Sequence, residues 1–326
     1  MPVLRDFFIA LSENQTLNKA AQKYGLKLGA QSVVAGTTIP EVIESIKELN
    51  AQGVSCTVNN IGEFVHDLEE ATKAKEHILE TIEALHENGV DAHISIKPSQ
   101  LGLEIDFDFC YDNVMEIVGK ANEYGIFVNL DQETYELLQP TYDLMDQVAQ
   151  TYDNIGTVIQ AYFFNAKEKT ERYKDFRLRL VKGAYKESAN VAYQDKIDID
   201  LNFIELIEYH LLNGKFTSIA THDHNVVNHV KQFVEDHGIP KDKFEFQMLY
   251  GFRKDLQEQL TAEGYQFCTY VPFGTDWYGY FMRRLAERPQ NINLVTKQVF
   301  NKKTNTVIGL AAAAFILGRL SKRNKS

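Results

Sequence analysis

The chain has 326 residues, of which 44% are hydrophobic and 24% charged, and its formal net charge is −11. This composition is typical of a soluble globular protein, and the length suits one large α/β domain or two modest ones. An acidic chain is a poor partner for nucleic acids, because phosphate groups require a basic face, so we expect no nucleic-acid partner.

Two features of the sequence favour a cytoplasmic location. The N-terminus has neither the apolar run of a secretory signal nor the Arg- and Ser-rich composition of a transit peptide. Three widely separated cysteines without CxxC spacing favour a reducing compartment over disulfides or structural zinc. We expect these thiols to fill core positions: Cys56, Cys110 and Cys268.

The first 45 residues precede the first predicted strand, and we interpret residues 1–45 as a helical arm packed on the domain that follows. Eight short β-like runs then alternate with amphipathic helical stretches such as Asp67–Asn88. The predicted strands are Ser55–Asn59, His93–Ile96, Ile126–Leu130, Thr157–Tyr162, Arg177–Val181, Thr217–Ala220, Phe244–Leu249 and Phe267–Val271. Eight such units predict an α/β fold, a (β/α)8 barrel over residues 46–300. No GxGxxG follows a strand, which disfavours a doubly wound dinucleotide-binding fold.

Residues 301–326 are predicted to form an apolar and basic tail. Its apolar run, Val307–Gly318, is shorter than the roughly 18 residues of a membrane span. The basic flanking residues are Lys302, Lys303, Arg319, Lys322, Arg323 and Lys325. Two alternatives remain open: a last helix packed on the barrel, or peripheral docking of a cytoplasmic protein at the anionic inner face of the membrane.

The predicted strands end in polar side chains, where barrel enzymes carry their catalytic groups. Lys97 follows the second strand, Asp131 follows the third, and Arg179 lies in the fifth. These charges in one mouth would suit a small acid, although Asp131 is equally able to cap the next helix. The other polar residues at strand ends are Asn59, Glu63, Gln160, Lys182, Thr221, His222, His224, Gln247 and Tyr270.

Two adjacent arginines, Arg283 and Arg284, follow the eighth strand in a helix-like stretch. Their guanidinium groups repel each other unless an anion joins them, and each offers a planar fork that holds a carboxylate with two hydrogen bonds. The alternative is that Arg283 pairs with Glu287, four residues later, on a solvent-exposed helix. Together with the charged strand ends, the pair favours a carboxylate-binding site.

Other chemistries are compatible with some of these residues. Lys97 or Lys182 could form a Schiff base in a barrel lyase or aldolase. His222 and His224 flank one acid, but no third ligand pattern is nearby, so we expect no metal site. A non-enzymatic binding module is disfavoured because the predicted mouth holds so many charged groups.

The polar segments together resemble the proline dehydrogenase family. The matching stretches stand in the family's order over about residues 55–290, and the RLVKGAY run and the YxPxG…RRLxE block are the most specific. They are Ser95–Lys97, Leu130–Asp131, Ile159–Tyr162, Arg179–Tyr185, Ala220–His222, Phe244–Gly251, Tyr270–Gly274 and Arg283–Glu287. The length resembles that of monofunctional bacterial members, since a fused aldehyde dehydrogenase would need several hundred more residues.

The resemblance implies a distorted (β/α)8 TIM barrel that binds FAD non-covalently at the C-terminal ends of its strands. L-Proline would be oxidised to Δ1-pyrroline-5-carboxylate by hydride transfer to the flavin, as the first step of proline catabolism to glutamate. The cofactor would carry the redox chemistry while the protein positions and polarises. A membrane quinone would reoxidise the flavin.

The resemblance also implies roles for single residues. Lys97, Arg283 and Arg284 would bind the substrate carboxylate, Asp131 would order these cations, and Glu63 would pair with Arg283 to close the site. The walls of the proline pocket would be Ala184, Tyr185, Leu249 and Tyr270. The flavin contacts would be Gln160, Arg179, Val181, Lys182, Gly183, Thr221 and His222. Arg179 would favour the reduced, anionic flavin by Coulomb attraction. Lys186 stands where some relatives have a tryptophan, which removes a stacking partner for adenine.

Overall fold

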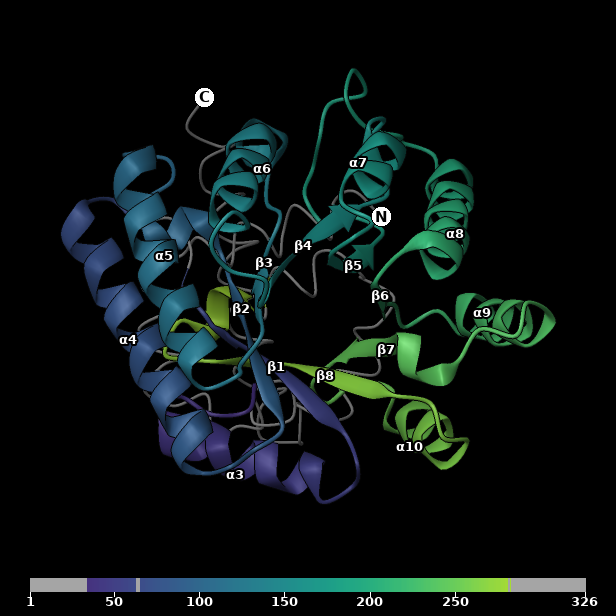
Figure 1. The fold of residues 1–326 in the computed structure, drawn as a ribbon, viewed down its shortest axis with the longest axis horizontal. Helices are drawn as coiled ribbons and strands as arrows, with labels where there is room; N and C mark the ends of the chain where they lie inside the picture. The colour runs from purple at the N-terminus through teal and green to yellow at the C-terminus, as the bar shows by residue number, and fades with distance from the viewer. Residues whose placement is uncertain (1–33, 63–64, 281, 283–326) are drawn as a thin grey trace, which may run out of the picture. The chain divides into compact units, whose positions relative to one another are not determined.

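Eight parallel strands close into a barrel in chain order, and β1 pairs with β8 to complete the ring (Figure 1). The strands are β1 (Ser55–Asn60), β2 (Ala92–Ile96), β3 (Val128–Leu130), β4 (Ile155–Gln160), β5 (Arg177–Val181), β6 (Phe216–Ala220), β7 (Phe244–Leu249) and β8 (Phe267–Phe273). The predicted (β/α)8 barrel is therefore confirmed.

The structure is a computed structural model that describes residues 34–62, 65–280 and 282. Residues Ala35–Gly274 form one unit, which contains the whole barrel. The described residues of the other unit are Val34, 275–280 and 282, and 277–280 form a helical turn. Most of the predicted arm, Glu63, the arginine pair and the predicted tail lie outside the described residues.

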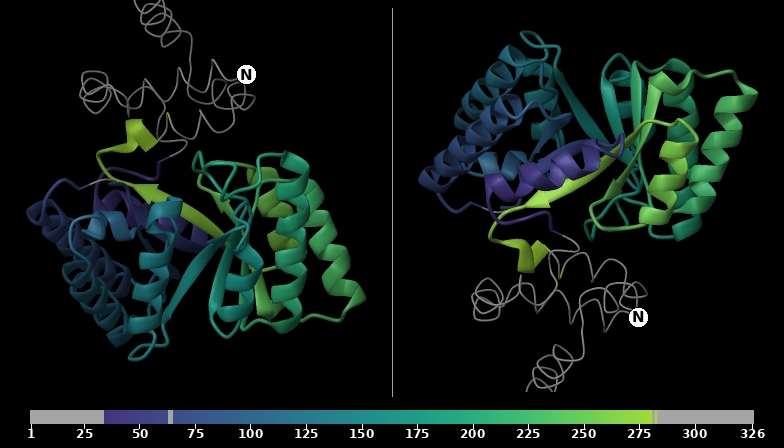
Figure 2. Two further views of the ribbon diagram at one scale, coloured as in Figure 1. Left: turned by 90° about the horizontal axis from the view of Figure 1, so that it is seen from above. Right: turned by 90° about the horizontal axis from the view of Figure 1, so that it is seen from below.

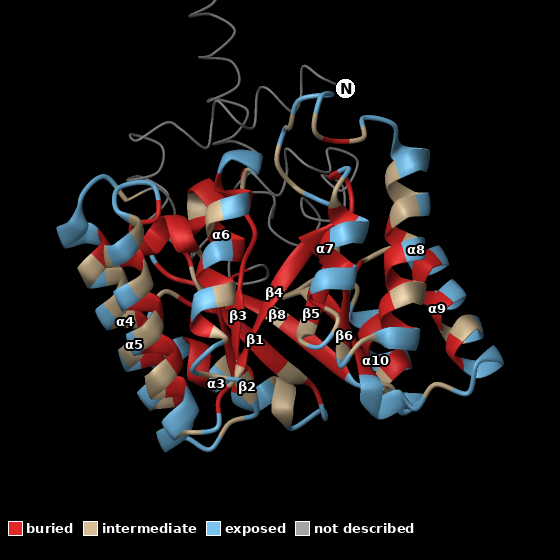
Figure 3. Ribbon diagram, turned by 45° about the horizontal axis from the view of Figure 1, so that its top comes forward, coloured by how far each residue is buried: buried red, intermediate tan, exposed pale blue. Residues whose placement is uncertain are grey.

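Helices alternate with the strands and surround the barrel (Figure 2). The α-helices are α3 (Ile39–Asn50), α4 (Leu68–Glu87), α5 (Phe107–Glu123), α6 (Tyr135–Val148), α7 (Ala166–Arg172), α8 (Lys196–Asn213), α9 (His224–Asp236) and α10 (Lys254–Ala262), and two 3-10 helices are η3 (Pro98–Leu101) and η4 (Lys241–Lys243). Figure 3 shows buried strands at the centre and exposed outer faces on the helices. Within the described ranges, none of the helices has the length and apolar character needed to cross a membrane.

Side-chain caps set the first residues of α3 and α4. Thr38 and Glu41 form a reciprocal capping box at the start of α3. The Asp67 carboxylate accepts a hydrogen bond from Glu70 N at 2.8 Å, and α4 ends before Asn88, as predicted. The three cysteines are buried and unpaired, which confirms their predicted place in the core.

The alternation of β5 places positive charge inside the barrel. Leu178 and Leu180 are fully buried in the hydrophobic core, whereas Arg177 and Arg179 project from the other face, since side chains alternate along a strand. Arg177 pairs with Glu245 of β7, with Nη2 2.6 Å from Oε1, and Arg179 pairs with Asp131, which follows β3. The two arginines therefore occupy successive levels of the barrel interior.

β3 and β4 begin at residues other than those predicted from the sequence. β4 begins at Ile155, earlier than predicted, and includes Gly156, where a Cβ would lie 2.2 Å from the Arg177 carbonyl oxygen. Glycine weakens a strand pattern but permits this close approach of β5. β3 begins at Val128 rather than Ile126, because Ile126 N donates to Ala121 O at 2.9 Å in the turn that follows α5.

β8 is longer than predicted and runs through Pro272 to Phe273. Proline lacks a backbone donor, and the predicted strand ends at Val271, directly before it. The Pro272 carbonyl accepts a hydrogen bond from Ala35 N at 3.1 Å, outside the sheet, whereas Phe273 O accepts one from Ile61 N, directly after β1, at 2.7 Å. Pairing with Asn59 and Asn60 of β1 therefore keeps Pro272 and Phe273 in β8.

Candidate active site

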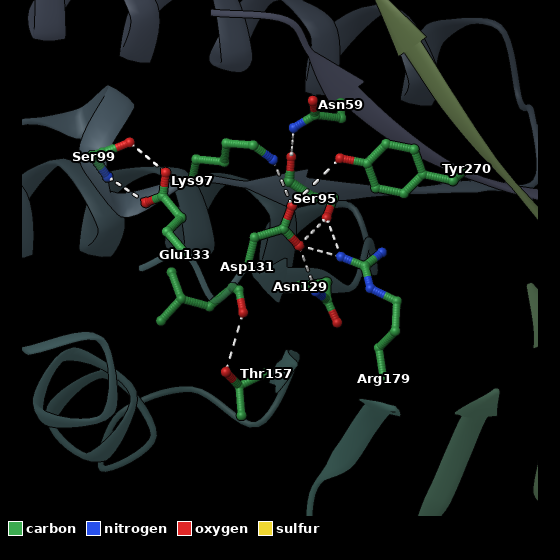
Figure 4. A network of polar contacts seen from close by, with 11 residues as sticks. Asn59, Ser95, Lys97, Ser99, Asn129, Asp131, Glu133, Thr157, Arg179 and Tyr270 are labelled. Carbon is green, nitrogen blue, oxygen red and sulfur yellow. Dashed lines mark hydrogen bonds and ion pairs between the residues drawn. The ribbon is translucent and has the colours of Figure 1, made fainter. Parts of the chain in front are cut away.

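A cluster of polar side chains surrounds Asp131 at the C-terminal ends of β2, β3, β5 and β8 (Figure 4). Asp131 is 6% exposed and Arg179 is 4% exposed, so both charges are removed from water. Buried charges are costly unless they are paired and hydrogen-bonded. The Asp131 carboxylate satisfies that requirement through contacts to both of its oxygens.

Three donors contact one oxygen of the Asp131 carboxylate. Ser95 Oγ donates to Oδ1 at 2.7 Å, and Asn129 Nδ2 donates to it at 3.1 Å. Arg179 Nη2 donates to the same oxygen and also to Ser95 Oγ, the latter at 2.7 Å. Ser95 is held in turn by Asn59, whose Nδ2 donates to Ser95 O at 2.9 Å.

The other oxygen of the carboxylate contacts groups that are less buried. Lys97 Nζ lies 3.0 Å from Asp131 Oδ2 and forms an ion pair with it. The Tyr270 hydroxyl donates to the same oxygen at 3.4 Å. The guanidinium of Arg179 lies over the Tyr270 ring, with Cζ 5.2 Å from the ring centroid. Asp131 therefore links Lys97, which follows β2, with Arg179 of β5 and Tyr270 of β8.

The charges of the cluster favour the ionised form of Asp131. Burial alone would raise the pKa of this carboxyl, but Arg179, Lys97 and the hydrogen bond from Ser95 outweigh it and lower the pKa below its ordinary value. Burial, followed by repulsion from Arg177 and Arg179, lowers the pKa of the neighbouring His93 well below its ordinary value. The barrel interior therefore holds a carboxylate and a neutral imidazole at neutral pH.

The loop after β3 is fixed by a second buried acid. The Glu133 carboxylate accepts from Ser99 N at 2.9 Å and from Ser99 Oγ at 2.5 Å, and Gln160 Nε2 donates to Glu133 O at 2.8 Å. The N-cap of α6 is Thr134, so Asp131 does not cap that helix. The alternative interpretation of Asp131 as a helix cap was therefore wrong.

The RLVKGAY segment leaves the barrel over an aromatic ring. Gly183 has φ +118, and a Cβ there would lie 2.4 Å from the Tyr162 ring, so the site requires glycine. Ala184 N donates to Gln160 Oε1 at 3.4 Å. Val181 and Tyr185 are half-buried beside this turn. Gln160 thus connects the ends of β4 and β5 to the loop after β3.

Lys182 pairs with two acids that do not belong to the Asp131 cluster. Its Nζ lies 2.6 Å from Asp200 Oδ1 and 3.3 Å from Asp223 Oδ2. Asp200 belongs to α8, and Asp223 is the N-cap of α9. Lys182 therefore joins the end of β5 to the starts of two helices.

Residues at the ends of β6 and β7 contact one another. Leu249 N donates to His222 Nε2 at 3.1 Å, so that nitrogen is an acceptor and its lone pair is engaged. Thr221 Oγ1 accepts from Asp223 N at 3.1 Å. Arg253, in the left-handed region with φ 48, donates from Nη1 to His222 O at 2.9 Å. Within the described ranges, no group of three His, Cys, Asp or Glu side chains could hold a metal ion.

The structure brings together four of the residues singled out from the sequence, namely Lys97, Asp131, Arg179 and Tyr270. Glu63, Arg283 and Arg284 lie outside the described residues. Sequence reasoning assigned no role to Ser95, Asn129 or Glu133. Period-two spacing is a signal for the first two, because Ser95 precedes Lys97 by two residues and Asn129 precedes Asp131 by two.

Comparison with known proteins adds independent information. The family model described as proline dehydrogenase matches residues 42–297. Proline dehydrogenase 2 of Bacillus subtilis (strain 168) is 42% identical over 302 residues, which are 92% of this chain and 100% of that protein. The proline dehydrogenase of Deinococcus radiodurans is 40% identical over 275 residues, covering 82% of this chain and 89% of that protein.

A solved structure shares the fold. Proline utilization A (PutA) from Bdellovibrio bacteriovorus, inactivated by N-propargylglycine, superposes with a TM-score of 0.76 at 23% identity. The likeness covers 87% of this chain but 36% of the PutA chain, so the present chain spans about a third of that protein. At this identity the likeness shows the barrel fold.

Proposed function

The chain belongs to the proline dehydrogenase family, and from that premise we propose that its barrel oxidises L-proline to Δ1-pyrroline-5-carboxylate with FAD as the hydride acceptor. The observation that carries the proposal is the buried cluster around Asp131 at the C-terminal mouth of the barrel. Barrel enzymes place their reacting groups at this end. The site residues below are assigned on the same basis.

The charge of the cluster supports a site for a carboxylate substrate. Lys97 and Arg179 carry two positive charges against the single negative charge of Asp131, so these described residues have a net charge of +1. Lys97 has three donors, of which one contacts Asp131, and another would donate to the proline carboxylate. Arg283 and Arg284, outside the described residues, would hold the same carboxylate with bidentate hydrogen bonds.

The walls of the proline pocket would be formed at the ends of β5, β7 and β8. Tyr270, positioned by its hydroxyl contact with Asp131, would pack against the ring, with Ala184, Tyr185 and Leu249 around it. Glu63 would pair with Arg283 and close the mouth over the substrate, which excludes water from the reacting atoms.

The cluster also fits a flavin. Arg179 Nη1 is buried and has no hydrogen-bond acceptor among the described residues. An unsatisfied buried donor is costly, and a charged one more so, which suits an acceptor atom supplied by a cofactor. FAD, when bound, would accept the hydride from the ring carbon beside the proline nitrogen. Arg179 would direct positive charge at the reactive part of the ring, which favours the reduced, anionic form.

The remaining flavin contacts are assigned to the ends of β4, β5 and β6. Their positions on three successive strands would let them follow an extended cofactor across the mouth of the barrel. The assigned residues are Gln160, Val181, Lys182, Gly183, Thr221 and His222.

Schiff-base chemistry is not favoured. A lysine must lose its proton to attack a carbonyl. Lys97 is paired with Asp131, and Lys182 is paired with Asp200 and Asp223. Either amine would have to leave these ion pairs to attack a carbonyl, which opposes the lyase and aldolase alternative.

Electrons would leave the reduced flavin for a membrane quinone, and the product would continue toward glutamate. A cytoplasmic enzyme with this acceptor needs contact with the membrane. We assign that contact to the tail, where the apolar run Val307–Gly318 lies between basic residues. The cationic flanks would complement anionic lipid at the inner face.

Turnover and cofactor identity test the proposal together. The purified chain should oxidise L-proline with a dye acceptor and form the cyclic imine, and denaturation should release FAD, identified by mass. Lys97→Met should retain FAD and lose turnover. A purified protein without flavin would contradict the proposal. Wild-type turnover of proline by the Lys97→Met variant would contradict the assignment of Lys97.

A further inference from the structure

The barrel interior contains two units in which a serine hydroxyl lies between an arginine and a carboxylate. In the lower unit, Ser218 Oγ donates to Glu245 Oε1 at 2.7 Å and accepts from Arg177 Nε at 3.3 Å. In the upper unit, Ser95 Oγ donates to Asp131 Oδ1 and accepts from Arg179 Nη2, each at 2.7 Å. The upper unit lies at the candidate active site, and the lower unit lies toward the N-terminal end of the strands.

The two units differ in what the carboxylate contacts beyond its serine and arginine. In the lower unit, Gln247 Nε2 donates at 2.6 Å to the same Glu245 oxygen. In the upper unit, the second oxygen of Asp131 holds Lys97 Nζ at 3.0 Å and Tyr270 Oη at 3.4 Å. Of these two units, the upper one is therefore the one whose carboxylate contacts residues assigned to substrate binding.

An aspartate side chain does not fix the direction of its own oxygens. The terminal torsion of a carboxylate is broad and roughly two-fold, so orientation depends on partners. Ser95 and Asn129 both donate to Oδ1 and are 2% and 3% exposed, on the buried side of the carboxylate. Asn59 in turn holds the backbone carbonyl of Ser95. This arrangement leaves Oδ2 directed at Lys97 and Tyr270.

We propose that Ser95 is a positioning residue for proline oxidation: its hydroxyl, supported by Asn129, orients the Asp131 carboxylate so that Oδ2 holds Lys97 and Tyr270 in place. The same hydroxyl also accepts from Arg179 Nη2, which Asp131 holds directly. This inference rests on the proposed function, in which Lys97 and Tyr270 face the substrate. Ser95 itself touches neither substrate nor cofactor in this account.

Ser95→Ala removes one oxygen atom and changes little volume, so it tests orientation more than packing. Loss of a hydrogen bond to a charged group corresponds to a change of about 10- to 150-fold, and we expect kcat/KM for proline to fall by that factor with unchanged FAD content. Ser95→Thr, which keeps the hydroxyl, should recover most of the loss. Ser218→Ala is the matched control, because it removes the equivalent hydroxyl at the other level; its kcat/KM should stay within about 2-fold.

A double-mutant cycle separates positioning from general destabilisation. In an Asp131→Asn background, Ser95→Ala should lower kcat/KM by less than about 3-fold more, because it acts through that carboxylate. A second readout is the dissociation constant of a proline analogue with oxygen in place of the ring nitrogen, followed by the flavin absorbance. We expect Ser95→Ala to weaken this binding and Ser218→Ala to leave it unchanged.

Each failure has its own result. The role of Ser95 would be overturned if Ser95→Ala kept the wild-type kcat/KM, or if Ser218→Ala lowered kcat/KM by the same factor. It would also be overturned if the effects of Ser95→Ala and Asp131→Asn on kcat/KM were additive. Full activity in Asp131→Asn would instead overturn the proposed function on which the inference rests. If Ser95→Ala does not fold, Asn129→Leu is the second variant, because it removes the other donor to Oδ1. It should lower kcat/KM in the wild-type background but not in the Asp131→Asn background. A fall in kcat/KM of the same size in both backgrounds would overturn the inference.

Discussion

Replacing Asp131 with asparagine should damage activity and stability together. The change keeps the shape of the side chain but removes the charge that balances Arg179 and Lys97. It also replaces one carboxylate oxygen, which accepts hydrogen bonds, with an NH2 group that faces hydrogen-bond donors. Removing one partner of a buried ion pair costs about 3–5 kcal/mol. For a large domain that is a fall in Tm of roughly 5–10 °C. Loss of one charged hydrogen bond to Lys97 should lower kcat/KM by about 10- to 150-fold.

Thermal melts and steady-state assays with proline and a dye acceptor measure the two effects of Asp131→Asn. Asp146→Asn is a suitable control, because Asp146 also contacts an arginine and a tyrosine, Arg172 and Tyr173, but lies 35% exposed on the outer helices. Exposed pairs contribute about 0–1 kcal/mol, so the control should change neither quantity much. Wild-type kcat/KM and Tm in Asp131→Asn would refute the reasoning.

The other predictions concern one residue of the described barrel domain, His210, and residues outside the described ranges. Arg284→Met should raise KM for proline by about 10- to 150-fold, because it removes a charged hydrogen bond; an unchanged KM contradicts the assignment. Glu63→Ala should slow flavin reduction in stopped-flow measurements while FAD content stays intact, and loss of FAD would indicate a structural role instead. Burial lowers the pKa of His210 to about 4. As pH falls below about 6.5, the imidazole is therefore protonated in the unfolded chain before it is protonated in the folded protein, and the free energy of unfolding should fall by roughly 3 kcal/mol between about pH 6.5 and 4. His210→Gln should flatten that slope in denaturant titrations, and an unaltered slope would show that this imidazole is not the cause. Deletion after Thr304 should abolish flotation with anionic liposomes and preserve dye-linked activity; an insoluble product would place the run Val307–Gly318 in the core.

The barrel was predictable because its signals are local. Eight apolar runs with helical stretches between them define the fold, and Arg177–Val181 was predicted with its observed bounds. Errors arose where a neighbouring strand decided the outcome. Gly156 weakens β4 when the sequence is considered alone, yet β5 approaches so closely that no side chain would fit. Pro272 stays in β8 because the residues on both sides of it pair with β1.

The site was predictable in its residue types but not in its connections. Charged strand ends identified Lys97, Asp131 and Arg179, because the barrel brings those ends to one face. The contact between Ser95 and Arg179 joins residues far apart in the chain, and no spacing rule predicts it. The pairing of Lys182 with Asp200 and Asp223 likewise depends on where α8 and α9 begin.

The most direct test is the absorption spectrum of the purified protein before and after anaerobic addition of L-proline. The proposed function predicts an oxidised-flavin spectrum that bleaches on addition, with one equivalent of cyclic imine formed per flavin, and little bleaching in Asp131→Asn at the same proline concentration. A colourless protein, or a flavin that proline does not reduce, would contradict the claim that the Asp131 cluster is a proline-oxidising site.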